Sequence, residues 1–126
     1  MDGIVDTSVI IDAYRGYTPA INWFTSNRQL LFAITPIVWM EVIEGAPDKK
    51  RQRALDGLLA RFQIVYLTGD DQKWAMQQLK TFNLSHNVDL TDALIAAPAF
   101  RLNLHLYTRN TKHFAPLIPK LVQQPY

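Results

Sequence analysis

The sequence predicts an α/β fold with three layers, in which helices cover both faces of a central, mostly parallel sheet of four to five strands. Two observations predict this class. Short apolar runs alternate along the chain with longer segments whose apolar residues recur at helical spacing, as they do around a parallel sheet. The 126 residues also match the size of one domain, and no repeat, linker or low-complexity segment divides them. We therefore expect residues 1–126 to form a single domain.

The first half of the chain predicts three strands and the helices between them. Ile4-Val5 reads as the first strand, and the polar run Asp6-Thr7-Ser8 can cap a helix that starts there. The elements expected next are a helix over about 19–27, a strand over 30–34, a helix from Pro36 to Gly45, a helix capped by Asp48 that runs through Phe62, and a strand over 64–67.

The second half predicts two more strands. Asp70 and Asp71 suit the positive end of a helix that begins with them, and the polar segment 83–87 reads as a loop. Asp89 and Asp92 have the spacing of a capping box before a helix over 93–102, in which Pro98 predicts a kink. A strand over 104–107, a turn with a short helix over 108–114 and an edge strand at 121–122 complete the fold.

Composition excludes some kinds of chemistry and leaves others open. The absence of Cys excludes disulfides, thiolate catalysis and Cys-based zinc sites. No secretory leader is apparent, and the longest apolar stretch is too short to span a bilayer, so we expect a cytoplasmic protein without membrane contact. A net charge of +2 permits nucleic-acid binding without arguing for it. The basic run Lys49-Lys50-Arg51-Arg53 is typical of a solvated helix face.

Acidic residues occur where a parallel sheet places its functional side chains. Asp6 directly follows the first strand, and ligands of such sheets bind at the carboxyl ends of the strands. Asp89, Asp92 and the turn Thr108-Arg109-Asn110 can reach the same edge if the first and fourth strands are neighbours, and Glu41 can join them from its helix. Each acid also has a plainer explanation, as a helix cap or an exposed helix residue.

Carboxylates gathered in this way favour a hard cation. Two of them about 4 Å apart repel by roughly 4 kcal/mol at an effective dielectric constant of about 20. Oxygen ligands without His or Cys favour Mg²⁺ or Mn²⁺, which activates water and polarises a phosphoryl oxygen. The substrate that suits such a site is a phosphodiester.

Four segments carry a family resemblance: Ile4–Asp12, Thr35–Val42, Asp92–Ala97 and Leu106–Phe114. In this order they resemble the motifs of PIN-domain nucleases of the VapC type, the toxins of VapBC type II toxin–antitoxin pairs. The resemblance implies a PIN-like fold and metal-dependent cleavage of RNA, with tRNA or rRNA as expected targets. It also implies homodimerisation and inhibition by a VapB-like antitoxin whose C-terminal segment fills the active groove.

The resemblance also assigns residues. It implies Asp6, Glu41 and Asp92 as the metal-binding acids. Asn110 stands where many members carry a fourth acid, and it can bind a metal or orient water through its carbonyl oxygen but brings no charge. Asp89 is the candidate that compensates, with a role as helix cap left open beside it.

Other residues near these motifs have supporting roles in this prediction. Thr7 and Thr108 are expected to orient a metal-bound water or a carboxylate, and Arg109 and Lys112 to contact phosphate. His113 is a candidate general base, but packing or capping is the favoured explanation, because a metal-bound hydroxide needs no separate base. Asp12 is expected to be solvated rather than catalytic. The expected reaction is in-line attack by a metal-activated water, which leaves 5′-phosphate and 3′-hydroxyl ends.

Three alternatives remain at this point. A PIN nuclease of RNA processing shares the chemistry without an antitoxin, and Asn110 leaves room for a catalytically silent PIN-like binding module. A phosphoacceptor receiver domain has a similar size and an acid after its first strand. It also needs an Asp directly after a middle strand and a Lys after a late one, and here Thr68-Gly69 and Arg109-Asn110 stand in those places.

Overall fold

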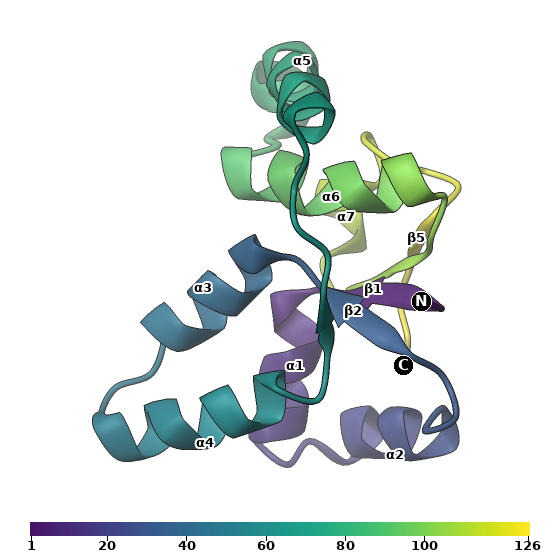
Figure 1. Ribbon diagram of the computed structural model, residues 1–126. Helices are drawn as coiled ribbons and strands as arrows, with labels where there is room; N and C mark the ends of the chain where they lie inside the picture. Colours follow the sequence, from purple (N-terminus) through teal and green to yellow (C-terminus); the bar gives the residue numbers. More distant parts are fainter.

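A computed structural model, which describes residues 1–126, has five short strands at its centre and helices on both sides of them (Figure 1). The strands are β1 (Gly3–Val5), β2 (Phe32–Ile34), β3 (Gln63–Ile64), β4 (Leu106–Tyr107) and β5 (Val122–Gln123). Their order in the sheet is β3-β2-β1-β4-β5, and all four neighbouring pairs are parallel. The predicted α/β class is confirmed, and β1 and β4 are neighbours as the convergence of the acids requires.

The helices form the two outer layers. In Figure 1, α6 lies above the sheet with α5 beyond it, and α1, α2 and α4 lie below. The helices are α1 (Thr7–Tyr14), α2 (Thr18–Ser26), α3 (Pro36–Glu44), α4 (Lys49–Leu59), α5 (Gly69–His86), α6 (Leu90–Leu102) and α7 (Thr111–Phe114). No helix is both long and apolar enough to cross a membrane.

The middle strand β1 is fully enclosed. Ile4 and Val5 have no exposed surface, and they belong to the main apolar core together with side chains of the neighbouring strands and of helices from both layers. Gly3 is required at the start of this strand, because a Cβ atom there would lie 2.6 Å from Cε2 of Tyr107 on β4. The close approach of β1 and β4 brings the ends of these two strands together at one edge of the sheet.

One predicted loop is wrong. Residues 83–87 were expected to be a loop because they are polar, yet α5 continues to His86. The hydroxyls of Thr81 and Ser85 donate to carbonyl oxygens one turn earlier, at 2.9 and 3.5 Å, so these polar side chains are accommodated within the helix. Asn87, in the left-handed conformation with φ of 55°, then ends it.

The second, third and fourth strands are shorter than predicted, the fifth is shifted by one residue, and the first is one residue longer. The third strand was predicted over 64–67 but occupies Gln63–Ile64, and Phe62 lies beyond the end of its predicted helix, which stops at Leu59. Pairing with β2 continues through a single further bond from the amide of Val65 to Ile34. Residues 66 and 67 therefore lie outside the ladder, although the apolar pattern extends over them.

The helix predicted over 93–102 is present and starts slightly earlier, at Leu90. Helix α6 runs without interruption through the buried Pro98, where a kink remains a prediction.

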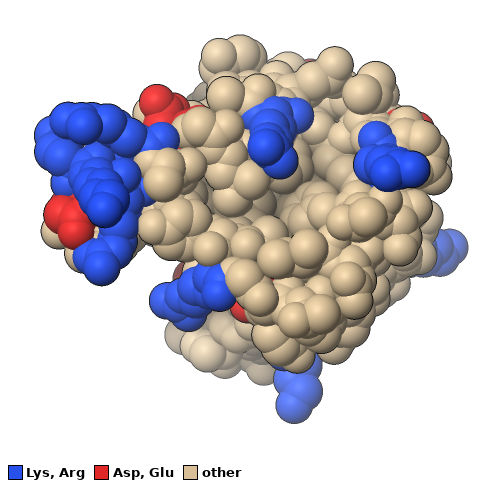
Figure 2. Space-filling view, turned by 90° about the horizontal axis from the view of Figure 1, so that it is seen from below, with Lys and Arg blue, Asp and Glu red and all other residues tan.

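The basic run Lys49-Lys50-Arg51-Arg53 lies exposed at the start of α4, and Figure 2 shows basic side chains gathered at this end of the molecule, on the left. Arg51 pairs with the capping residue Asp48 at 2.7 Å. This surface is the solvated helix face that the charge pattern predicts.

Candidate active site

Asp6 lies directly after β1, and its side chain does not cap the helix that follows. It occupies the N-cap position of α1, but its carboxylate makes no capping hydrogen bond. Instead, Oδ2 accepts hydrogen bonds from Oγ1 of Thr108, at 2.7 Å, and from Oγ of Ser8, at 3.3 Å. The side chain is 4% exposed, and burial raises the pKa of its carboxyl group despite these bonds. The cap that the sequence left open as an alternative is not formed.

Glu41 reaches the same region from α3. The helix is started by Thr35, whose hydroxyl accepts from the amide of Val38, and Glu41 lies in its second turn. Oε1 of Glu41 accepts from Oγ1 of Thr7 at 3.0 Å. Partial burial and the charges of Asp6, Asp89 and Asp92 raise the pKa of Glu41. The carboxylates on three different elements are therefore close enough to repel one another.

Asp89 and Asp92 form the predicted capping box at the start of α6. Oδ1 of Asp89 accepts from the amide of Asp92 at 2.9 Å, and Oδ2 of Asp92 accepts from the amide of Asp89 at 3.2 Å. Burial raises the pKa of Asp92. It would also raise that of Asp89, but hydrogen bonds from Asp92 and Thr91 outweigh burial and lower it. The cap is therefore real, and it leaves both carboxylates beside the pocket.

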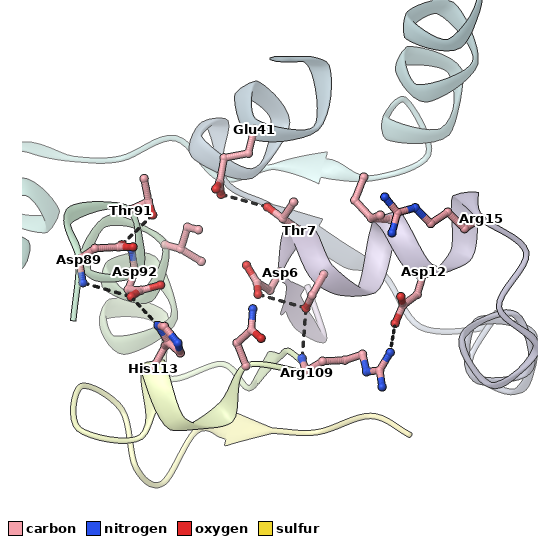
Figure 3. Close-up of a pocket in the computed structure, with 14 residues that line it drawn as sticks. Asp6, Thr7, Asp12, Arg15, Glu41, Asp89, Thr91, Asp92, Arg109 and His113 are labelled. Atoms are coloured by element: carbon pink, nitrogen blue, oxygen red, sulfur yellow. Dashed lines mark hydrogen bonds and ion pairs between the residues drawn. The ribbon is translucent and has the colours of Figure 1, made fainter. Parts of the chain in front are cut away.

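These side chains line one open, polar pocket with a volume of about 610 Å³, shown in Figure 3. Only two of its fourteen lining residues are hydrophobic, which is far more polar than most small-molecule pockets. We call Asp6, Glu41, Asp89 and Asp92 the acidic cluster. The pocket is lined by Asp6, Thr7, Ser8, Ile11, Asp12, Arg15, Glu41, Asp89, Thr91, Asp92, Ile95, Arg109, Asn110 and His113.

The predicted residues are brought together, with one exception. Thr7, Arg109 and Asn110 join the acidic cluster in the pocket wall, and the fully buried Thr108 lies behind Asp6 and accepts from the amide of Asn110 at 2.9 Å. Lys112 is exposed on α7 and does not line the pocket. No three His, Asp or Glu side chains lie close enough, as they stand, to hold a metal ion between them. The acids therefore line the pocket without meeting at one point.

One prediction was wrong, since Asp12 is not simply solvated. Its Oδ2 accepts from Nη1 of Arg109, at 3.0 Å, and from the hydroxyl of Tyr126, at 2.8 Å. The sequence contains a signal that Asp12 faces the pocket. Ser8, Asp12 and Arg15 follow one another at helical spacing and form a polar stripe on α1. The contact with Tyr126 has no such signal, because it depends on how the end of the chain folds back.

His113 also lines the pocket, although its role was left open in the sequence analysis. Its Nδ1 lies 3.3 Å from Oδ2 of Asp92. In this position it can orient the Asp92 carboxylate or offer a nitrogen to a ligand. Packing alone therefore does not describe His113, because its ring faces a carboxylate of the pocket.

Comparison with known proteins places this arrangement in a family. The model of the PIN domain matches residues 3–116, which is most of the chain. The chain therefore belongs to the PIN-domain family.

Its relatives within that family are VapC ribonucleases. Ribonuclease VapC10 of Mycobacterium tuberculosis is 34% identical over 120 residues, which cover 94% of this chain and 89% of that protein. Ribonuclease VapC1 of Methanocaldococcus jannaschii is 31% identical over 123 residues, or 90% of this chain and 79% of its own. A solved toxin–antitoxin complex from Klebsiella pneumoniae contains a chain with 29% identity and a TM-score of 0.80, with 99% of this chain and 98% of that chain covered. The similarity extends over nearly the whole chain.

Proposed function

We propose that this chain is a metal-dependent endoribonuclease that acts as the toxin of a type II toxin–antitoxin pair. The observation that carries the proposal is the acidic cluster, held at the carboxyl ends of β1 and β4 in a pocket that is open to a polymer. The relatives named as VapC ribonucleases support the activity, because they match the chain almost end to end. The alternatives without toxicity or without catalysis lack such support.

The donor set fits Mg²⁺ or Mn²⁺. Carboxylates supply oxygen donors. Burial raises the pKa of Asp6, Glu41 and Asp92, and neighbouring carboxylates also raise it for Glu41 and Asp92, so a bound cation would relieve both effects. Asp6, Glu41 and Asp92 would hold the ion, and either the carbonyl oxygen of Asn110 or the carboxylate of Asp89 would complete its ligands. Such an ion supplies activation of water and stabilisation of charge on the phosphate.

The residues around the acids prepare them for this role. Thr108 and Ser8 fix Asp6, Thr7 fixes Glu41, and His113 holds Asp92, so each carboxylate is oriented before the ion binds. Arg109, in the pocket wall, would contact the phosphate backbone. Lys112 would contact RNA only outside the pocket. The products would carry 5′-phosphate and 3′-hydroxyl ends.

The partners follow from the same assignment. A VapB-like antitoxin would insert a segment into the open pocket and block the acids. The similarity of this chain to one in a toxin–antitoxin complex from Klebsiella pneumoniae supports such a partner. We also propose a homodimer. Exposed apolar side chains on α5 and α6, Met76 at 69% and Leu90 at 59%, offer a surface that a second copy would cover.

The test is cleavage of total bacterial RNA by the purified protein with Mg²⁺ or Mn²⁺, with and without EDTA. Asp6→Asn should reduce cleavage by at least about 100-fold, because an amide keeps the hydrogen bonds but not the charge. Asp56→Asn is the matched control, since Asp56 is exposed on α4 and its side chain makes no hydrogen bond or ion pair. Discrete fragments that persist in EDTA or in Asp6→Asn would rule out the metal mechanism, and a folded protein without cleavage would indicate the binding module.

A further inference from the structure

The pocket is divided by charge. The acidic cluster occupies one end and the middle, whereas Arg15 and Arg109 lie toward the other end, as Figure 3 shows. An RNA strand brings a negative charge at every nucleotide, so cleavage of one phosphodiester places neighbouring phosphates on both sides of the acids. The two arginines offer one of those phosphates a cationic place within the same pocket.

Arg109 is held in a fixed position. Its Nη1 donates to Oδ2 of Asp12 at 3.0 Å, and the hydroxyl of Tyr126 donates to the same oxygen at 2.8 Å. The guanidinium carbon lies 5.2 Å from the ring centre of Tyr17 and 5.8 Å from that of Tyr126, within the range of cation–π contact. A side chain ordered in this way loses little further freedom when a ligand binds.

The guanidinium also remains available. The side chain of Arg109 is 42% exposed, and only one of its five N–H donors is engaged by Asp12. An ion pair with this exposure contributes little to stability, so folding alone does not account for the arrangement. The guanidinium of Arg15, exposed at the end of α1, makes no hydrogen bond or ion pair within the chain, although the backbone amide of Arg15 is bonded to Ile11.

The two ends of the pocket are connected through Ser8. Its hydroxyl donates to Oδ2 of Asp6 at 3.3 Å and accepts from the backbone amide of Arg109 at 3.1 Å. Arg109 is therefore fixed relative to the carboxylate that would bind the metal. A strand that lies along the pocket would then place one phosphate at the acids and a neighbouring one at the arginines.

We propose that Arg15 and Arg109 form a subsite for the phosphate next to the one that is cleaved, with Asp12, Tyr17 and Tyr126 as positioning residues for Arg109. This inference rests on the proposed ribonuclease function and adds to it. The subsite sets the direction in which the strand enters the pocket, because only one flanking phosphate can reach the arginines while its neighbour lies at the acidic cluster.

The experiment uses an RNA oligonucleotide that contains the mapped cleavage sequence, with a neutral methylphosphonate placed at one linkage at a time. Binding is measured by fluorescence anisotropy with Mg²⁺ in the Asp6→Asn protein, which does not cut. Neutralising one flanking linkage should weaken binding by about ten-fold, the size expected for a hydrogen-bonded charge. The same change should have no effect when Arg15→Gln and Arg109→Gln are added.

Control variants separate the subsite from general charge. Arg28→Gln removes an exposed arginine outside this pocket and should leave the position-specific loss intact. Arg15→Gln alone leaves the Asp12 contact undisturbed and should remove part of the loss. A loss of binding of equal size with and without the two arginines would overturn the subsite. The ion pair between Arg109 and Asp12 would then serve to hold the chain end against α1, or Arg109 would contact a carboxylate of an antitoxin. Absence of both RNA binding and cleavage would instead refute the proposed function.

The positioning role is tested in the active protein. Tyr126→Phe keeps the aromatic ring but removes the hydroxyl that binds Asp12. KM should rise about three-fold, which is less than the loss of a whole charged hydrogen bond would cause, and kcat should stay unchanged. Asp12→Asn should raise KM further, and Asp12→Glu should restore part of the loss. Variants that lower only the melting temperature, with KM unchanged, would show that these residues are merely structural.

Discussion

Three of the four carboxylates in the acidic cluster accept a hydrogen bond from a hydroxyl group. Thr108 and Ser8 donate to Asp6, Thr7 donates to Glu41, and Thr91 donates to Asp89 at 2.8 Å. A hydroxyl orients a carboxylate without neutralising it, whereas an arginine would cancel its charge. The pocket is therefore built to keep negative charge in fixed directions, which suits the binding of a cation.

Glu41→Gln tests the electrostatic cost of this arrangement. The fold raises the pKa of Glu41 above its ordinary value of 4.5, so the folded state disfavours the carboxylate form. At a pH above the raised pKa, the uncharged Gln should stabilise the metal-free protein, by no more than about 1 kcal/mol because Glu41 is exposed to solvent. As the pH falls through the raised pKa toward 4.5, wild-type Glu41 becomes protonated and the advantage should disappear.

The measurement is thermal unfolding of both proteins in EDTA, from about pH 4 to about pH 8, which brackets carboxylate titration. Gln can still accept the hydrogen bond from Thr7, so the comparison isolates the charge. A variant that is less stable than wild type at neutral pH would show that repulsion within the acidic cluster is negligible. The same variant should lose cleavage activity.

At the residue scale, the sequence was sufficient wherever a strand or helix end fixes the position of a side chain. Asp6 follows a strand and Asp92 lies three residues after a cap, so their places could be predicted. The orientation of a carboxylate could not, because it depends on Thr108, which lies 102 residues from Asp6. Asp12 was misjudged for the same reason, since one of its two partners lies 114 residues away.

Besides their packing, helices α5 and α6 are connected by an ion pair that involves one buried carboxylate. Asp71 is 2% exposed and completes the capping box of α5 with Thr68, while its Oδ1 accepts from Nε of Arg101 on α6 at 2.9 Å. Burial would raise the pKa of Asp71, but the hydrogen bonds from Arg101 and Thr68 outweigh it and lower the pKa. One side chain therefore both starts a helix and fixes it to its neighbour.

Arg101→Gln should destabilise the protein by about 3 kcal/mol, because it leaves a buried carboxylate without its charged partner. The pKa of Asp71 is lowered in the fold, so the stabilisation is fully present above the ordinary value of 3.8 and is lost as pH falls through the lowered pKa. Urea unfolding at neutral and at strongly acidic pH measures both effects. The double variant Asp71→Asn/Arg101→Gln should recover much of the loss, and equal losses in the single and double variants would contradict this account.

At the element scale, the order of strands and helices could be predicted, because apolar periodicity records it. The lengths could not. Polar residues 83–87 look like a loop in isolation, but α5, which packs against α6, continues through them to His86. The strands contain only two or three residues each, and the runs predicted as strands over 30–34, 64–67 and 104–107 are longer than the strands that form there.

For the whole molecule, divalent cations should act as a stabiliser. An ion that binds only the folded state at roughly 100 times its Kd contributes about 2.7 kcal/mol, which corresponds to a rise in Tm of about 10 °C for a domain of this size. Differential scanning calorimetry with Mg²⁺ or Mn²⁺ against EDTA measures the shift. Asp6→Asn should lose most of it and Asp56→Asn should keep it. An equal shift in all three proteins would place the ion elsewhere.

The neighbouring positions of β1 and β4 also have a consequence for the timing of folding. The strand that ends at Asp6 is synthesised first, but its partner follows about a hundred residues later, so the central contacts of the sheet are among the most distant in the chain. Such topology slows folding, because distant segments must meet before their contacts form. A nascent chain that has not yet released Thr108 from the ribosome lacks the hydroxyl that holds Asp6. The surroundings of Asp6 can therefore be completed only when synthesis of the chain is almost finished.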